Sequence, residues 1–260
     1  MQYGPARTRE RSSTRSPLSG RLLTAPVYHS KAKAVYRGGV PVSPSSSPVP
    51  PKPRLRGVLH QAAFPVSLVV GVLLIVGADG AGGHTAAAVF ACSVAVCFGA
   101  SALYHRVNWT PHLRLWMRRI DHTGVLFLIA GTYTPVCLLV LDGAWRIVVL
   151  AIVWAGALVG AALKFAWPEA PKWVAVLVGL TLGWVGVVVL PQLVTRLDPA
   201  ALALLAAGGL VYTAGAIIYA CHRPNPVPTV FGYHEVFHAL TLVAVACQYA
   251  AIAFFVIPSA

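Results

Sequence analysis

The chain has 260 residues, of which 57% are hydrophobic and only 10% are charged. Soluble domains contain roughly 25% charged residues, so this composition excludes an ordinary soluble protein and indicates a membrane protein. The formal net charge is +13, but eleven of the twenty Lys and Arg residues lie before residue 57. The positive charge therefore belongs mainly to an N-terminal segment.

Residues 1–56 are rich in Pro, Ser and Arg and show no apolar periodicity, which predicts a disordered basic tail. Such a tail next to membrane helices fits contact with anionic lipid headgroups better than binding to DNA or RNA. We therefore expect membrane lipids and no nucleic acid as partners. The tail lacks the continuous apolar stretch of a secretory signal, and although its composition superficially resembles a transit peptide, we expect a cytosolic extension. The sequence predicts no particular oligomeric state.

From residue 57 onward the sequence consists of apolar stretches of roughly 17 to 25 residues, each long enough to cross a hydrocarbon core as a helix. Helices are required because lipid cannot satisfy backbone N–H and C=O groups. Residues 57–260 are therefore predicted to form an all-α, polytopic membrane domain, a seven-transmembrane helix bundle. The predicted spans are 61–78, 84–105, 119–141, 144–164, 172–190, 199–220 and 234–257.

The charges between the spans predict the orientation. With seven spans, the N-terminal tail and the joints after the second, fourth and sixth spans share one side of the membrane. Even without the tail, this side carries seven Lys and Arg residues, and the other side carries two. The positive-inside rule then predicts a multi-pass protein of the cell membrane, with its N-terminus in the cytoplasm and its C-terminus outside.

Ionisable residues inside a membrane are costly, so each one marks a candidate functional site. Ser101 and His105 lie four residues apart at the end of the second span, Asp121 opens the third, and His234 and His238 open the seventh. The second span ends on the cytoplasmic side, and the third and seventh begin there. The topology therefore predicts that all five side chains lie at one depth, near the cytoplasmic surface.

The three histidines are candidate zinc ligands. His234 and His238 are at positions i and i+4 of a helix, so each can direct an imidazole nitrogen toward one ion. His105 would supply a third nitrogen and leave a fourth tetrahedral position for water. Asp121 would hydrogen-bond that water or orient a ligand imidazole. A lone His at a helix end is more often interfacial, and such a pair arises by chance, but their agreement in depth favours a metal.

The segment 234–238 also matches the H-E-x-x-H pattern of metalloproteases, in which Glu235 would be the general base. This match is weak, because no third zincin ligand follows His238. Glu235 could equally neutralise Arg118 or Arg119, or accept a hydrogen bond from a neighbouring helix. The other histidines are predicted to be solvated or interfacial: His29, His60, His84, His112, His122 and His222.

Four segments resemble the hemolysin III branch of the PAQR (progestin and adipoQ receptor) family. They are Ser-Ala-Leu-Tyr-His at 101–105, Arg-Ile-Asp-His-Thr-Gly at 119–124, Ile-Ala-Gly-Thr-Tyr-Thr-Pro at 129–135 and His-Glu-Val-Phe-His at 234–238. Their order and spacing match over about residues 57–260. The long basic tail departs from the compact bacterial pattern.

The resemblance implies a seven-helix bundle with an intracellular-side zinc site. Residues corresponding to His105, His234 and His238 would be the ligands, with Asp121 and Ser101 beside the metal-bound water. The resemblance also links the chain to a superfamily that includes alkaline ceramidases and adiponectin receptors, where hydrolysis of lipid amides is the associated chemistry.

Three functions follow as hypotheses. The first is membrane lipid homeostasis through the zinc site, without turnover if Asp121 closes the fourth position. The alternative is a ceramidase-like, zinc-dependent hydrolase of lipid amides or esters, in which Asp121 and Ser101 are catalytic and water keeps the fourth position. A second alternative, suggested by the family's name, is a pore-forming hemolysin-like protein. No predicted span carries a polar stripe along its length, which argues against a pore.

Overall fold

The computed structural model describes residues 1, 35–37, 40–42 and 52–258. The chain divides into two compact units, Met1–Val49 and Pro50–Ala260. In the first unit, strands β1 (Val35–Arg37) and β2 (Val40–Val42) pair antiparallel. Most of the predicted basic tail, including the part expected to contact lipid headgroups, lies outside the described residues.

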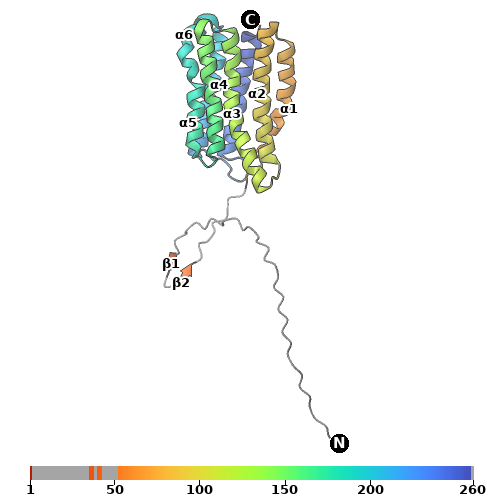
Figure 1. Ribbon diagram of the computed structural model, residues 1–260, viewed down its shortest axis with the longest axis vertical. Coiled ribbons are helices and arrows are strands. Elements are labelled where there is room, and N and C mark those ends of the chain that lie inside the picture. The colour runs from red at the N-terminus through yellow and green to blue at the C-terminus, as the bar shows by residue number, and fades with distance from the viewer. Residues whose placement is uncertain (2–34, 38–39, 43–51, 259–260) are drawn as a thin grey trace, which may run out of the picture. The chain divides into compact units, whose positions relative to one another are not determined.

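In the second unit, the elements of the described part, residues 52–258, are helices joined by loops, and seven segments are long and apolar enough to cross a membrane (Figure 1). This confirms the predicted all-α, seven-helix membrane protein. The elements are α1 (Val58–Val76), α2 (Gly80–Arg106), α3 (Pro111–Leu139), α4 (Gly143–Ala166), α5 (Lys172–Gly183), the 3-10 helix η1 (Val185–Val189), α6 (Leu190–Arg196), α7 (Pro199–Cys221), α8 (Tyr233–Ala251) and the π-helix η2 (Ile252–Val256).

The third span begins eight residues earlier than the sequence predicts, at Pro111 rather than at residue 119. The Thr110 side chain accepts a hydrogen bond from the Leu113 N–H, and Pro111 occupies the first turn, where its missing N–H costs nothing. Its first turns carry Arg114 and Arg118, so hydropathy alone underestimates the helix length.

The fifth span is interrupted rather than continuous. Between α5 and α6 the chain forms the 3-10 helix η1, and the Tyr133 side chain from α3 bonds the backbone at this break. The Tyr133 hydroxyl donates to the Gly183 carbonyl over 2.6 Å and accepts from the Gly186 N–H over 2.8 Å. Unsatisfied backbone groups are expensive in lipid, so this one side chain stabilises the interruption.

The seven spans close into a ring. Along the chain, α1 packs against α2, α2 against α3, and α3 against α4. The ring continues through contacts of α4 with α5, α5 with α7, and α7 with α8, and it closes where α8 contacts α1. The third span also touches α5 and η2, and it is the most buried of the seven. Large apolar side chains on the outer faces are exposed, including Val69, Leu73, Ile147 and Val159, as expected for surfaces that face lipid.

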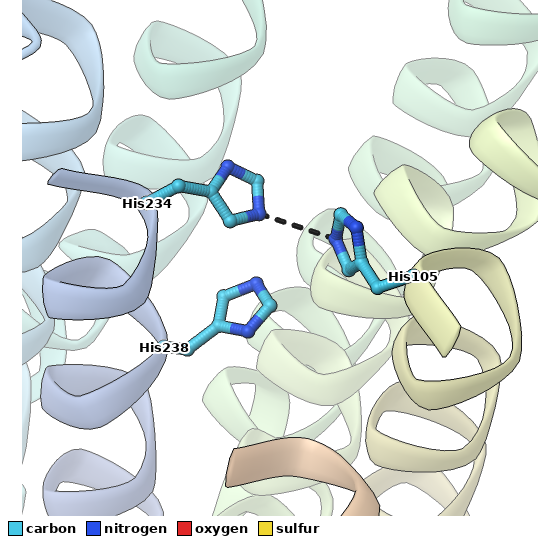
Figure 2. Close-up of side chains that lie close together, drawn as sticks. All are labelled: His105, His234 and His238. Atoms are coloured by element: carbon cyan, nitrogen blue, oxygen red, sulfur yellow. Dashed lines mark hydrogen bonds between the residues drawn. The ribbon is translucent and has the colours of Figure 1, made fainter. Parts of the chain in front are cut away.

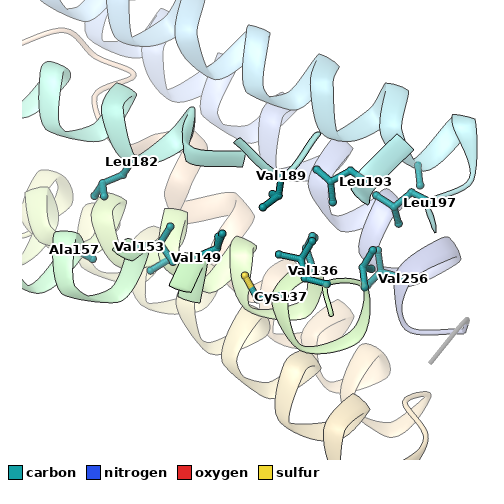
Figure 3. Close-up of a cluster of buried hydrophobic side chains, with 14 of the residues drawn as sticks. Val136, Cys137, Val149, Val153, Ala157, Leu182, Val189, Leu193, Leu197 and Val256 are labelled. Carbon is teal, nitrogen blue, oxygen red and sulfur yellow. The ribbon is translucent and has the colours of Figure 1, made fainter. Parts of the chain in front are cut away.

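The larger apolar core lies toward the end of the bundle where α3 ends and α4 begins. Side chains from α3, α4 and the interrupted fifth span interdigitate there with Val256 of the last span (Figure 3). The opposite end, where α2 ends and α8 begins, is packed differently. It holds most of the buried polar residues and is called the histidine end below.

Candidate metal centre

Two helices bring three imidazoles together at the histidine end. His105 occupies the last turn of α2, and His234 and His238 occupy the first two turns of α8 (Figure 2). All three residues are buried, and one ligand nitrogen from each lies within 4.8 Å of the others. The Nε2 atoms of His105 and His234 are 3.2 Å apart. The sequence predicted this grouping from span counting, and the structure places the three residues side by side.

The spacing of His105 and His234 fits a tetrahedral metal ion. Zn–N bonds of about 2.0 to 2.1 Å in tetrahedral geometry separate two ligand nitrogens by about 3.3 Å, close to the spacing of His105 and His234. Three imidazole ligands are also the donor set of known catalytic zinc sites. The cluster can therefore hold a metal ion.

Asp121 and Ser101 lie beside the cluster. Asp121 Oδ2 is 3.6 Å from His105 Nε2, and its side chain is buried. Ser101, one turn before His105 on α2, is also buried and lies next to Asp121. The structure thus adds a carboxylate from α3 and a hydroxyl from α2 to the histidines of α2 and α8.

Glu235 has a structural environment that the H-E-x-x-H pattern does not suggest. Its Oε2 accepts a 2.8 Å hydrogen bond from the Gly232 N–H at the start of α8, and its Oε1 pairs with Arg56. The side chain is almost completely buried in these contacts. Glu235 therefore caps α8 and neutralises Arg56, rather than Arg118 or Arg119.

Residues 52–57 connect the two ligand helices, and we call this segment the strap. The N–H groups of Arg54 and Leu55 donate to the carbonyls of Thr229 and Val230, just before α8. The Lys52 ammonium donates to the His105 carbonyl at the end of α2. Burial, followed by the charges of nearby arginines, lowers the pKa of Lys52. The composition of residues 1–56 predicts that the strap belongs to a disordered tail, but in the structure it contacts both ligand helices.

Gly57 explains how the strap can run so close to the candidate metal centre. It has a φ of +79°, and a Cβ atom at this position would lie 2.4 Å from the His105 Cβ. Only glycine combines this backbone conformation with such an approach. The backbone of the strap therefore packs directly against the Cβ atom of His105, a candidate ligand.

His60 was predicted to be solvated or interfacial, and this prediction is wrong. His60 lies in α1, is buried, and stacks on His238 with ring centroids 4.0 Å apart and planes within 3°. Neither of its ring nitrogens has a hydrogen-bond partner among the described residues. Its contact with His238 arises because α1 packs against α8, which position in the sequence does not show.

A cavity of about 710 Å³ adjoins the histidines. This volume lies within the range of about 300 to 1,000 Å³ that is typical of small-molecule sites. Its polar wall includes the three candidate ligands, Asp121 and Ser101. Its apolar wall is formed by side chains of α3, α4, α5 and α8, among them Val125, Leu126, Leu163, Val178 and Phe237. A polar cluster thus meets an apolar chamber large enough for part of a lipid.

Comparisons with known proteins agree with this architecture. The family model "Haemolysin-III related" matches residues 50–249. Hemolysin-3 from Bacillus cereus is 28% identical over 206 residues, which cover 78% of this chain and 91% of the relative. A Hemolysin-3 homolog from Bacillus subtilis (strain 168) is 29% identical over 167 residues, which cover 64% of this chain and 75% of the relative. The matched region includes the strap, all three histidines, Asp121 and Ser101.

Proposed function

The chain belongs to the Haemolysin-III related family, and from this premise we propose that it acts in membrane lipid homeostasis through a zinc ion held by His105, His234 and His238. The convergence of three buried imidazoles on one point carries this proposal. Three neutral nitrogen donors at these spacings suit zinc, which accepts tetrahedral imidazole coordination.

The cavity favours turnover over a purely structural role for the ion. A structural zinc normally has all four positions closed by protein ligands, whereas these three histidines adjoin a chamber of about 710 Å³. Zinc in this position would supply a Lewis acid that polarises a carbonyl group and makes water more acidic. The activity that we propose is hydrolysis of a lipid amide or ester.

The protein's own residues perform the remaining steps of this proposed reaction. Asp121 lies beside His105 at the edge of the histidine cluster, where it would accept a proton from the water that attacks the carbonyl carbon. It would return this proton to the amine or alcohol that leaves as the C–N or C–O bond breaks. Ser101 lies next to Asp121, where its hydroxyl can donate to the carboxylate and orient it in the proposed reaction. The apolar wall around Leu126 and Phe237 holds the acyl chain and excludes bulk water from the carbonyl carbon.

Metal analysis of the purified protein tests the zinc site directly. We expect about one zinc per wild-type chain and a loss of zinc in His105→Ala and His238→Ala. His84→Ala is the control, because His84 is exposed at the first turn of the same helix as His105. Full zinc content in both ligand variants would refute the site.

Turnover is tested separately, with wild-type protein and a panel of lipid amides and esters. Release of fatty acid that disappears in His238→Ala supports hydrolysis. If fully zinc-loaded protein releases no fatty acid, hydrolysis is refuted and the role that remains is membrane lipid homeostasis without turnover. Ion flux through reconstituted protein would instead favour the pore that the relatives' name suggests.

We also propose the orientation that the loop charges predict, with the histidine end and the N-terminus in the cytoplasm. Cys221 is exposed at the end of α7 near the histidine end, and Cys92 is exposed within α2. In a Cys92→Ala background, an impermeant thiol reagent should label Cys221 in inverted membrane vesicles but not in intact cells. Labelling in intact cells would reverse the assignment.

A further inference from the structure

The cavity has a second polar region, which lies beside the histidine cluster. Arg118 of α3, Lys164 of α4 and Lys172 of α5 all line it and lie around His122. The acidic residues of the lining do not balance them. Asp121 lies at the histidine cluster, and Glu169 alone stands near the three cations, exposed in the loop between α4 and α5. This part of the cavity therefore carries an excess of positive charge.

Lys164 is the unusual member of this cationic group. Lys164 is only 8% exposed, and it carries a charged group in an otherwise apolar membrane span. No hydrogen bond or ion pair links its ammonium group to another side chain in residues 52–258. Lys164 lies in the last turn of α4 and lines the cavity. A cation in a membrane span that has no opposite charge from the protein marks a candidate contact for a ligand. A ligand in the cavity can supply that opposite charge.

The other two cations are held in place by the protein. The Arg118 guanidinium donates to the Pro168 carbonyl, while its buried Nε has no partner among the described residues. The Lys172 ammonium lies 2.8 Å from the Tyr233 hydroxyl and 2.8 Å from His222 Nε2. These contacts fix both positive charges around the cavity while leaving a donor of Arg118 free. These positive charges and the free Arg118 donor are positioned to bind an anion.

We infer that the cavity recognises its lipid by an anionic phosphate group, which binds Lys164 and Arg118 while the acyl chain lies along the apolar wall near the histidines. This inference rests on the proposed function, because it names the class of lipid that the same cavity takes. A guanidinium and an ammonium together recognise phosphate oxygens by charge-assisted hydrogen bonds. The substrate class is thus an anionic phospholipid rather than a neutral ceramide.

Lipid binding to the purified, zinc-loaded protein in neutral detergent tests the inference. The probes are phosphatidylglycerol, the zwitterionic phosphatidylcholine, a neutral ceramide and inorganic phosphate. We expect phosphatidylglycerol to bind about tenfold more tightly than either other lipid, and Lys164→Gln and Arg118→Gln each to reduce this affinity about tenfold. Lys164→Arg should restore binding, which separates loss of charge from misfolding. Arg114→Gln is the matched control, since Arg114 is exposed one turn before Arg118.

The outcomes separate the two proposals. Equal binding of the three lipids, or unchanged binding by Lys164→Gln, would overturn the anionic-lipid inference even if zinc is present. If inorganic phosphate binds in a Lys164-dependent manner and phosphatidylglycerol does not bind, the ligand is free phosphate and the lipid part of the inference is overturned. If metal analysis finds no zinc site in the wild-type protein but the protein still binds phosphatidylglycerol preferentially, the anionic-lipid inference is supported and only the proposed zinc function is refuted.

Discussion

Arg56 in the strap and Glu235 in the first turn of α8 form an ion pair across 179 positions of sequence. Glu235 is 1% exposed, whereas the Arg56 side chain remains 20% exposed. The pair joins the segment before the first span to the helix that carries two of the three candidate ligands. Its removal should therefore affect both stability and the metal centre.

Arg56→Gln should lower the free energy of unfolding by about 3 kcal/mol, because it leaves the buried Glu235 carboxylate without its counter-charge. Arg56→Gln combined with Glu235→Gln should be less destabilised than Arg56→Gln alone, because the buried charge is then absent as well. Denaturant titration in detergent micelles measures both. Additive effects of the two substitutions would show that the residues do not interact.

Gly57→Ala should reduce zinc affinity at least tenfold, because the added methyl group would displace the Cβ atom of His105 and with it the imidazole. Gly80→Ala is the control: Gly80 has a φ of +62°, but nothing lies within 4 Å of the position of an added Cβ. Both variants bear a backbone strain of about 1 to 2 kcal/mol. Zinc titration of the two proteins isolates the effect of the clash, and equal affinities would contradict it.

His60 should support the site by packing rather than by coordination, since its ring lies parallel to that of His238. His60→Phe retains an aromatic ring and should keep full zinc content. His60→Ala should lower zinc affinity, because it opens space beside His238. If His60→Phe lost the metal, His60 would have to be a ligand itself.

Asp121→Asn should reduce lipid hydrolysis by about 10² to 10⁴-fold at saturating zinc, because the amide cannot accept the proton of water. The zinc content at saturation should remain unchanged. Asp79→Asn provides a comparison, since Asp79 is exposed just before α2, at the opposite end of that helix from His105. Loss of zinc in parallel with activity would instead make Asp121 a ligand.

Removal of the metal should lower the Tm of the wild-type protein. A ligand present at 100 times its Kd stabilises the folded state by about 2.7 kcal/mol, and a chelator abolishes this contribution. His238→Ala should show a lower Tm from the start and no further change with the chelator. Thermal unfolding with and without the chelator measures the difference, and a chelator-insensitive wild type would argue against a bound ion.

The sequence predicts the fold well because lipid permits few architectures. The spans are long, apolar and separated by short polar joints, and their number places His105, Asp121 and His234 at one end. The same reasoning cannot place His60 beside His238 or pair Arg56 with Glu235. Those contacts depend on how α1 and the strap pack against α8, and no periodicity or charge pattern encodes this packing.

The interruption of the fifth span also could not be predicted from the sequence. Between α5 and α6 the helix type changes, and this change depends on the Tyr133 hydroxyl of another span, which bonds the backbone of Gly183 and Gly186. Helix boundaries such as Pro111 were underestimated for a simpler reason, because charged first turns reduce the hydropathy of a membrane helix.

The separation of the ligands along the chain determines when the centre can form during synthesis. His105 is translated long before His234 and His238, and α8 leaves the ribosome after the other six spans. The three imidazoles can meet only once the last helix has been inserted and has closed the ring against α1. Capture of the metal would thus mark the completion of membrane insertion, and a chain that stalled before α8 would remain unloaded.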